Sequence, residues 1–299
     1  MTDSQEGEIL ALIGSEPDGL TSIEVQKLMF AYGMDSDGRK SYDFMPFEQG
    51  CYSFNLARDV HALASSGLVR QAPQKIGKPR WLLTEEGKIR AFHHATSTRR
   101  MVAFRRKYPL SGKTLIADIY RRFPYFAIRS TIADIVLGDD RRALKLIKAA
   151  SPARSTPLAT IGYEGRSVED FFNVLIQAGI TALCDVRKNP ISRKYGFSKS
   201  TLEKACAGAG IDYRHYPELG IPSHERTDLR CQADYDELFA RYRKTILKAG
   251  ATTVDALAQR VANGECVALM CFEKNPCQCH RTQVAVAVSA KLNAEYDVL

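Results

Sequence analysis

The sequence lacks the apolar run that a membrane-spanning helix needs, because no stretch approaches about 18 apolar residues. Residues 1–6 are polar and acidic, without the basic start and apolar core of a secretory signal. No internal repeat and no low-complexity segment is present. The composition, with 45% hydrophobic and 25% charged residues, is typical of globular domains. We therefore expect a cytoplasmic, globular protein with no membrane partner.

Disulfide bonds are not expected, although the chain contains eight cysteines, seven of them after residue 180. A chain of 299 residues without an export signal should keep its thiols reduced. Cys271, Cys277, Cys279 and His280 do not follow a standard zinc-ligand spacing, so we also expect no bound metal. One alternative is a reactive thiolate, which the start of the last helix and Arg281 would both favour. The other is that Cys279 and His280 only anchor a turn.

Acidic residues are scarce between residues 88 and 154, where four Asp and no Glu accompany sixteen Lys and Arg. The segment therefore carries a net charge of +12, whereas the whole chain carries only +8. Such a concentration indicates either a polyanionic partner or a solvated helical face. We favour nucleic acid as the partner, because the cations occur in clusters such as Arg105-Arg106-Lys107.

Residues 1–87 have the element order of a winged helix, with three helices followed by two strands. The run "KLMFAYG…YDFMPFEQGCYSFNLARDVHALASSGLV" also resembles the N-terminal modules of some phage-related and toxin-neutralising bacterial proteins. A winged helix binds DNA or another protein, so this domain implies either kind of partner. Residues 88–150 are mostly helical by period and are predicted to form a basic connector or small helical domain. A linker is predicted at residues 151–157.

Residues 156–299 alternate short apolar strands with helices, which predicts a mainly parallel α/β sheet flanked by helices. Strands are predicted at residues 158–162, 181–186, 212–216 and 267–272. Helices are predicted at residues 167–178, 198–209, 235–248, 254–263 and 280–291. Ligands of such sheets bind beyond the carboxyl ends of the strands. The residues that follow each strand are therefore the candidate site.

The first two strand ends supply carboxylates and cations. Tyr163 and Glu164 follow the first strand in a glycine-rich turn that lets the backbone approach a ligand closely. Asp185 ends the second strand, and a carboxylate that terminates an apolar strand indicates a functional role. Four cations and no acid then occur within the eight residues from Arg187 to Lys194, in a loop set by an Asn-Pro step. Phosphate contact is the favoured use of this loop, and a solvated basic loop is the alternative.

The later strand ends add further polar groups. Tyr213 and His215 belong to the third strand, and Glu273 follows the last one. We interpret His215 either as a hydrogen-bonded histidine of the core or rim, or as a residue that contacts the ligand.

Three segments in this half of the chain resemble the bacterial and archaeal family known as domain of unknown function 488. They are "TIGYEGRS", "DVRKNPISRKYGFSKSTLEKACAGAGIDYRHYPELG" and "CFEKNPCQCHR", which occur in the order typical of the family. Tyr163 stands where many members have His, and Ile221 stands where many have a second Gly. We therefore expect no imidazole at position 163 and a differently shaped loop around position 221. The resemblance implies a set of polar positions: Asp185, Arg187, Pro190, Ser192, Arg193, Tyr213, Glu273, Cys279, His280 and Arg281. The family name implies no function.

The candidate site suits a nucleic-acid-processing hydrolase acting on DNA in repair or defence. The candidate catalytic residues are Asp185, Glu273, Glu164 and Tyr163. The candidate substrate-binding residues are Arg187, Ser192, Arg193, Tyr213, His215, Cys279, His280 and Arg281. N-glycosidic, base-removing cleavage without a cofactor is slightly favoured, because arginines outnumber carboxylates and closely spaced nuclease acids are absent. The alternatives are a nuclease that requires Mg²⁺ and a non-catalytic nucleic-acid-binding or regulatory protein.

Overall fold

A computed structural model describes residues 1–35, 40–72, 77–153, 156–226 and 228–299. The chain forms two compact units, Met1–Ser151 and Pro152–Leu299. The boundary between them falls within the predicted linker, of which residues 154 and 155 lie outside the described residues. Among the described helices, none combines the length and the apolar character that crossing a bilayer requires.

The first unit begins with helices interrupted by short strands. Its first elements are α1 (Asp3–Gly14), β1 (Leu20–Thr21), α2 (Ser22–Asp35), β2 (Met45–Phe47), β3 (Gly50–Tyr52), α3 (Phe54–Ser65), β4 (Val69–Ala72) and β5 (Arg80–Leu83). Strands β1, β5 and β4 form an antiparallel sheet in that order, and β2 pairs with β3 in a separate hairpin. Three helices and a terminal strand pair therefore occur in the order expected for residues 1–87.

The rest of the first unit is helical and packs on the same core. It comprises α4 (Glu85–His93), α5 (Ala95–Lys107), α6 (Gly112–Arg122), α7 (Ala133–Leu137) and α8 (Arg141–Ala149), with a 3₁₀ turn at Pro124–Ala127. Leu28 of α2 and Leu63 of α3 lie in one hydrophobic cluster with Met101 of α5 and Tyr120 of α6. Residues 88–150 thus share a core with the segment that precedes them.

Acids of the same unit neutralise part of its positive charge. Arg90 pairs with Glu6, and Arg105 with Glu16. Six of the fifteen cations that the structure describes between residues 88 and 153 form ion pairs: Lys88, Arg90, Arg105, Lys107, Arg121 and Arg122. The excess of +12 therefore overstates the charge that this segment presents to a polyanion.

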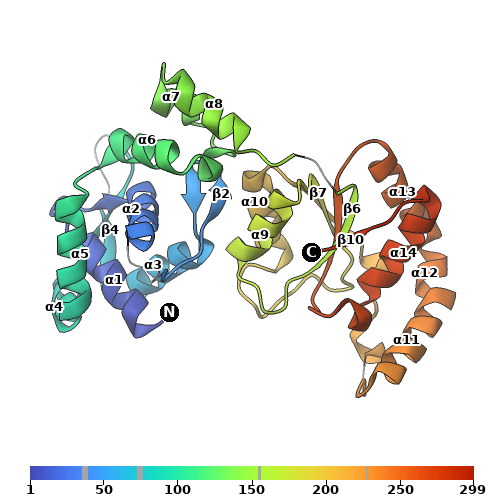
Figure 1. The fold of residues 1–299 in the computed structure, drawn as a ribbon. Coiled ribbons are helices and arrows are strands. Elements are labelled where there is room, and N and C mark those ends of the chain that lie inside the picture. Colours follow the sequence, from blue (N-terminus) through green and yellow to red (C-terminus); the bar gives the residue numbers. More distant parts are fainter. Residues whose placement is uncertain (36–39, 73–76, 154–155, 227) are drawn as a thin grey trace. The chain divides into compact units, whose positions relative to one another are not determined.

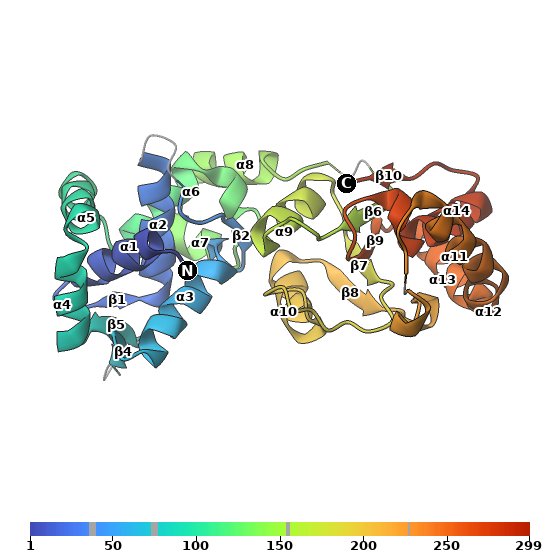
Figure 2. The ribbon, with the colours of Figure 1, turned by 90° about the horizontal axis from the view of Figure 1, so that it is seen from below.

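The second unit is a five-stranded parallel sheet covered by helices, as the sequence predicted. Its strands are β6 (Leu158–Gly162), β7 (Ala182–Asp185), β8 (Asp212–His215), β9 (Val267–Cys271) and β10 (Asp297–Val298). Its helices are α9 (Val168–Gln177), α10 (Lys199–Ala209), α11 (Gln232–Lys244), α12 (Ile246–Ala249), α13 (Ala251–Ala262) and α14 (His280–Leu292). The strand order is β10-β6-β9-β7-β8, and α9 and α10 cover one face while α11, α13 and α14 cover the other (Figures 1 and 2).

The insertion of β9 between β6 and β7 decides where the site lies. Every residue of β6, β7 and β9 is buried, as expected for central strands covered on both faces. Leu269 of β9 packs in one cluster with Leu238 of α11, Leu257 of α13 and Val284 of α14. Because all three strands run in the same direction, their carboxyl ends meet at one edge of the sheet.

Two local features differ from the sequence prediction. The helix expected at residues 235–248 is divided at Thr245, whose backbone angles of −114° and −86° are not helical. The Thr245 hydroxyl donates to the Arg241 carbonyl at 2.9 Å, a contact that commonly bends helices. The edge strand β10 was not predicted, since two exposed residues give no periodic pattern.

Candidate functional site

Three strand ends supply the groups at the carboxyl edge of the second unit. Tyr163 follows β6, Asp185 ends β7, and Glu273 follows β9 at a distance of two residues. Gly162 allows Glu273 to approach the end of β6 closely, because a Cβ atom at position 162 would overlap the Glu273 carbonyl oxygen. Any larger residue would push the loop after β9 away from β6.

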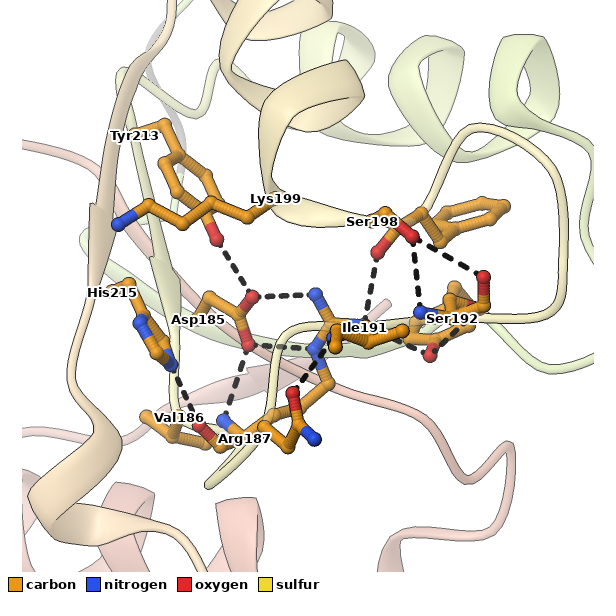
Figure 3. Close-up of polar contacts among 12 residues, drawn as sticks. Asp185, Val186, Arg187, Ile191, Ser192, Ser198, Lys199, Tyr213 and His215 are labelled. Carbon is orange, nitrogen blue, oxygen red and sulfur yellow. Dashed lines mark hydrogen bonds and ion pairs between the residues drawn. The ribbon is translucent and has the colours of Figure 1, made fainter.

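Asp185 is locked in a buried ion pair (Figure 3). Its side chain is fully buried, and Arg187 binds both of its oxygens, through Nε to Oδ1 at 2.8 Å and through Nη2 to Oδ2 at 2.6 Å. The Arg187 amide adds a bond to Oδ1 at 3.1 Å, and the Tyr213 hydroxyl adds one to Oδ2 at 2.8 Å. Burial and the adjacent carboxylate raise the pKa of Tyr213. The Asp185 oxygens are therefore engaged within the protein.

Arg187 continues this network toward Tyr163. Its Nη1 donates to the Tyr163 hydroxyl at 2.9 Å and to the Phe197 carbonyl at 3.0 Å. The buried ring of Tyr163 stacks on Phe197, with centroids 4.3 Å apart and planes 9° from parallel. Desolvation is the largest single effect on the pKa of Arg187 and lowers it, but the hydrogen bonds and charges of Asp185 and Tyr163 together outweigh it, so the pKa of Arg187 is raised. Neither side chain is positioned to hold a base or a phosphate as the sequence suggested, because both are buried and already paired.

A cleft of about 390 Å³ lies beside this network at the same edge. Its charged lining residues are Arg187, Lys188, Arg193, Lys194, Arg226 and Glu273. Tyr163, Asn189, Ile191, Ser192, Ile221, Ser223, Cys271, Phe272 and His280 complete the lining. Among the described residues, Glu273 is thus the only carboxylate that lines the cleft.

Glu273 is held from two sides. It is 8% exposed, and Oε1 forms an ion pair with Arg226. The Cys271 thiol donates to its Oε2 at 3.3 Å. The buried Arg281 donates through Nη1 to the Glu273 main-chain carbonyl at 2.5 Å and through Nη2 to the Lys274 carbonyl at 3.3 Å. Arg281 therefore fixes the loop that carries Glu273, and is not exposed to a ligand.

A thiol and imidazole cluster lies under the same end of the cleft. The Cys271 Sγ is 3.9 Å from Nδ1 of His280, and Nε2 of that ring is 2.8 Å from the Val186 carbonyl. The hydrogen bond with Cys279 lowers the pKa of the Cys271 thiol, against the effect of burial. Burial raises the pKa of the Cys279 thiol. In the described part of the chain, all cysteines are free thiols.

The family comparison covers most of this edge of the sheet, although Tyr163 and Glu164 precede the matched residues. A family model described as "Domain of unknown function DUF488" matches residues 167–288. Residues 167–288 are a DUF488 domain. The match confirms the resemblance seen in the sequence and spans α9 to most of α14. No curated protein matches the chain.

The other predicted residues of the site lie around the DUF488 domain's cleft. Ser192 lines it, and its Oγ is 3.3 Å from the Tyr163 hydroxyl. Glu164 is exposed outside the lining and accepts the Lys274 amide through Oε2 at 2.8 Å. His215 does not line the cleft, and its Nε2 is 2.8 Å from the Arg187 carbonyl. This hydrogen bond lets His215 support the main chain at the start of the basic loop.

Arg226, Phe272 and Cys271 line the cleft of the DUF488 domain but were not predicted as site residues from the sequence. Arg226 lies in an irregular segment between β8 and α11, where no periodic pattern singles it out. The apolar run predicts Phe272 as the last residue of a strand, but the strand ends at Cys271 and the Phe272 side chain is 41% exposed. The sequence places Cys271 near the end of the last strand but indicates a role for it only within the cysteine and histidine cluster. Its position at the end of the last central strand was the signal that could have identified it.

Proposed function

We propose that the protein is a nucleic-acid-processing hydrolase and that the DUF488 domain's cleft takes a nucleotide and releases its base. The observation that carries this proposal is a cleft that, among the residues the structure describes, has one carboxylate, a cationic lining and an exposed apolar rim. In the reaction, water adds across the bond between the sugar carbon C1′ and the base nitrogen. The sugar carbon gains the hydroxyl group, and the leaving base takes the proton.

The basic loop supports contact with phosphates. Lys188 and Arg193 are exposed and line the cleft, and neither forms an ion pair with any described residue. Lys194 is half-buried, and its Nζ donates to the Tyr163 carbonyl at 3.1 Å. The loop is held in place by bonds such as Ser192 N to Ser198 Oγ at 3.0 Å (Figure 3). A fixed, exposed cationic loop suits a phosphate backbone, because the charges need no reorganisation on binding.

Apolar side chains at the rim favour a base as the group that enters. Ile191 projects from the middle of the basic loop and is 76% exposed, and Phe272 is 41% exposed. Enzymes that act on a base take it out of the stack and hold it between apolar or aromatic side chains. Proteins that kink a duplex insert similar apolar wedges between base steps. Ile191 and Phe272 supply both kinds of contact beside the phosphate-binding cations.

The single carboxylate favours base release over metal-dependent strand cleavage. Mg²⁺ ions in nucleases are held by several oxygen ligands, whereas both Asp185 oxygens are already bound to Arg187 and Tyr213. Glu273, paired with Arg226, is positioned as an ionised group. Such a carboxylate stabilises an oxocarbenium-like sugar or orients water.

The proposal is tested on the products. The intact chain is incubated with labelled single- and double-stranded DNA carrying normal and alkylated bases, once with Mg²⁺ and once with chelator. We expect abasic sites in both conditions, revealed by strand breakage only after alkaline treatment. Direct strand scission that depends on added Mg²⁺ would instead establish a nuclease, and binding without any product would establish a binding module.

The basic loop gives a separate prediction for affinity. Arg193→Ala and Lys188→Ala should each weaken DNA binding, because each removes one phosphate contact and its released counterion. Each should also reduce the slope of log Kd against log salt by about 1. Fluorescence anisotropy at several salt concentrations measures both effects. Lys204→Ala removes an exposed cation of α10 outside the cleft and should leave the slope unchanged.

A further inference from the structure

We propose that Cys271, Cys279 and His280 bind a zinc ion at the inner end of the cleft. Each residue offers one ligand atom, and these three atoms all lie within 4.8 Å of one another. All three side chains are buried. The three residues do not follow a standard zinc-ligand spacing, because one ligand ends a strand while the other two lie at the start of the following helix. The proposal rests on this ligand set and not on the proposed function.

The geometry around His280 matches that of a metal ligand. Its Nε2 lies 2.8 Å from the Val186 carbonyl, which can only accept, so Nε2 carries the proton. The lone pair of the neutral ring is then on Nδ1, which faces Cys271 Sγ at 3.9 Å. Histidines that bind zinc usually donate their other ring N–H to a carbonyl or carboxylate in this way. In a tetrahedral zinc site, a sulfur and a nitrogen ligand lie about 3.5 Å apart, which a small shift of these side chains would reach.

The charges of the cluster suit a zinc ion. Two thiolates neutralise Zn²⁺, so the loaded cluster would add no net charge to a buried region. That region already contains the Arg281 guanidinium, which is fully buried and whose Nε has no partner among the described residues. Mixed sulfur and nitrogen ligands also select zinc over Mg²⁺ or Ca²⁺, which prefer oxygen ligands.

The fourth position of the ion would open to the cleft. Cys271 and His280 both line the cleft, and Glu273 Oε2 lies 3.3 Å from Cys271 Sγ. Three protein ligands with one open position are typical of catalytic zinc, whereas structural zinc is closed by four. The ion would thus have either water or Glu273 as its fourth ligand.

The test measures the metal directly. The intact chain is purified under reducing conditions without chelator, and zinc is quantified by elemental analysis. We expect roughly one zinc per chain, as one tetrahedral site requires. In the metal-free protein, added Co²⁺ should produce the intense absorption of a tetrahedral ion and the charge-transfer band of thiolate ligands. Cys271→Ser and His280→Ala should lose both signals.

Cys277, which lies two residues before the ligand Cys279, provides a matched control. Cys277 is exposed and lies outside the cluster, so Cys277→Ser should keep the zinc and the cobalt spectrum. Loss of metal from Cys277→Ser to the same extent would overturn the assignment. So would a wild-type protein that holds neither zinc nor cobalt, whether or not the ligand variants fold. These readouts need no nucleic acid. The zinc proposal can therefore be rejected while the hydrolase proposal is supported, and the hydrolase proposal can be rejected while the zinc proposal is supported.

Discussion

Glu273→Gln is expected to lower the turnover of base release by about a hundredfold or more, the scale of a lost general base or charge stabiliser. Glu273 is the only carboxylate of the described residues that lines the cleft, so no neighbour can replace it. The substitution nearly preserves size and removes only the charge. Nucleic-acid affinity should therefore stay within a few-fold of wild type, since the exposed cations of the basic loop are untouched. Single-turnover release of labelled base and anisotropy measure the two effects separately.

Glu164→Gln is the matched control for this experiment. Glu164 follows the neighbouring strand β6, but its side chain is exposed outside the cleft lining. The turnover of the Glu164→Gln variant should remain close to that of wild type. If Glu164→Gln were the inactive variant and Glu273→Gln the active one, the catalytic group would be at the other strand end. If both kept full activity, Glu273 would be a structural partner of Arg226.

Asp185→Asn should destabilise the second unit by about 3–5 kcal/mol, the cost of leaving a buried charge without its partner. The fully buried carboxylate holds Arg187 through both oxygens and also accepts from Tyr213. An amide would turn N–H groups toward a guanidinium that can only donate. The sequence alone indicated a catalytic role for Asp185, whose loss would lower turnover. The observed ion pair instead predicts a lower free energy of unfolding.

Urea denaturation of the intact chain measures this loss, and Trp81 offers an internal reference. It is the only tryptophan in the sequence and is buried in the first unit. The transition followed by its fluorescence should not move, whereas the transition of the second unit followed by circular dichroism should shift to lower urea. Glu203→Gln breaks an exposed ion pair with Lys199 and should cost at most about 0.5 kcal/mol. An equally small effect of Asp185→Asn would contradict the structural role.

The local pattern of the sequence was enough to predict the second unit's sheet. Alternating apolar strands and amphipathic helices placed β6 at Leu158–Gly162, as observed, and β7 and β9 within one or two residues. The rule that ligands bind at strand ends then selected Glu273 and the basic loop, both of which line the cleft. These predictions succeed because they depend only on short-range periodicity and strand direction.

The same rule could not rank the strand-end residues. Asp185 and Glu273 look alike in sequence, since each is a carboxylate after an apolar strand. Only packing shows that Asp185 is enclosed by Arg187 and Tyr213, whereas Glu273 faces the cleft. Arg187 and Arg281 likewise read as phosphate ligands, yet both are buried and bond to the protein itself.

The sequence by itself determined the α/β pattern, the basic loop and the family to which residues 167–288 belong. The tertiary structure alone decided which of these groups meet. The placement of β9 between β6 and β7 brings Glu273 beside Tyr163, and an irregular segment delivers Arg226 to the same cleft. It also gathers Cys271, Cys279 and His280 into one cluster. Strand order and loop path arise from long-range packing of the whole sheet, which the periodicity of a single segment does not encode.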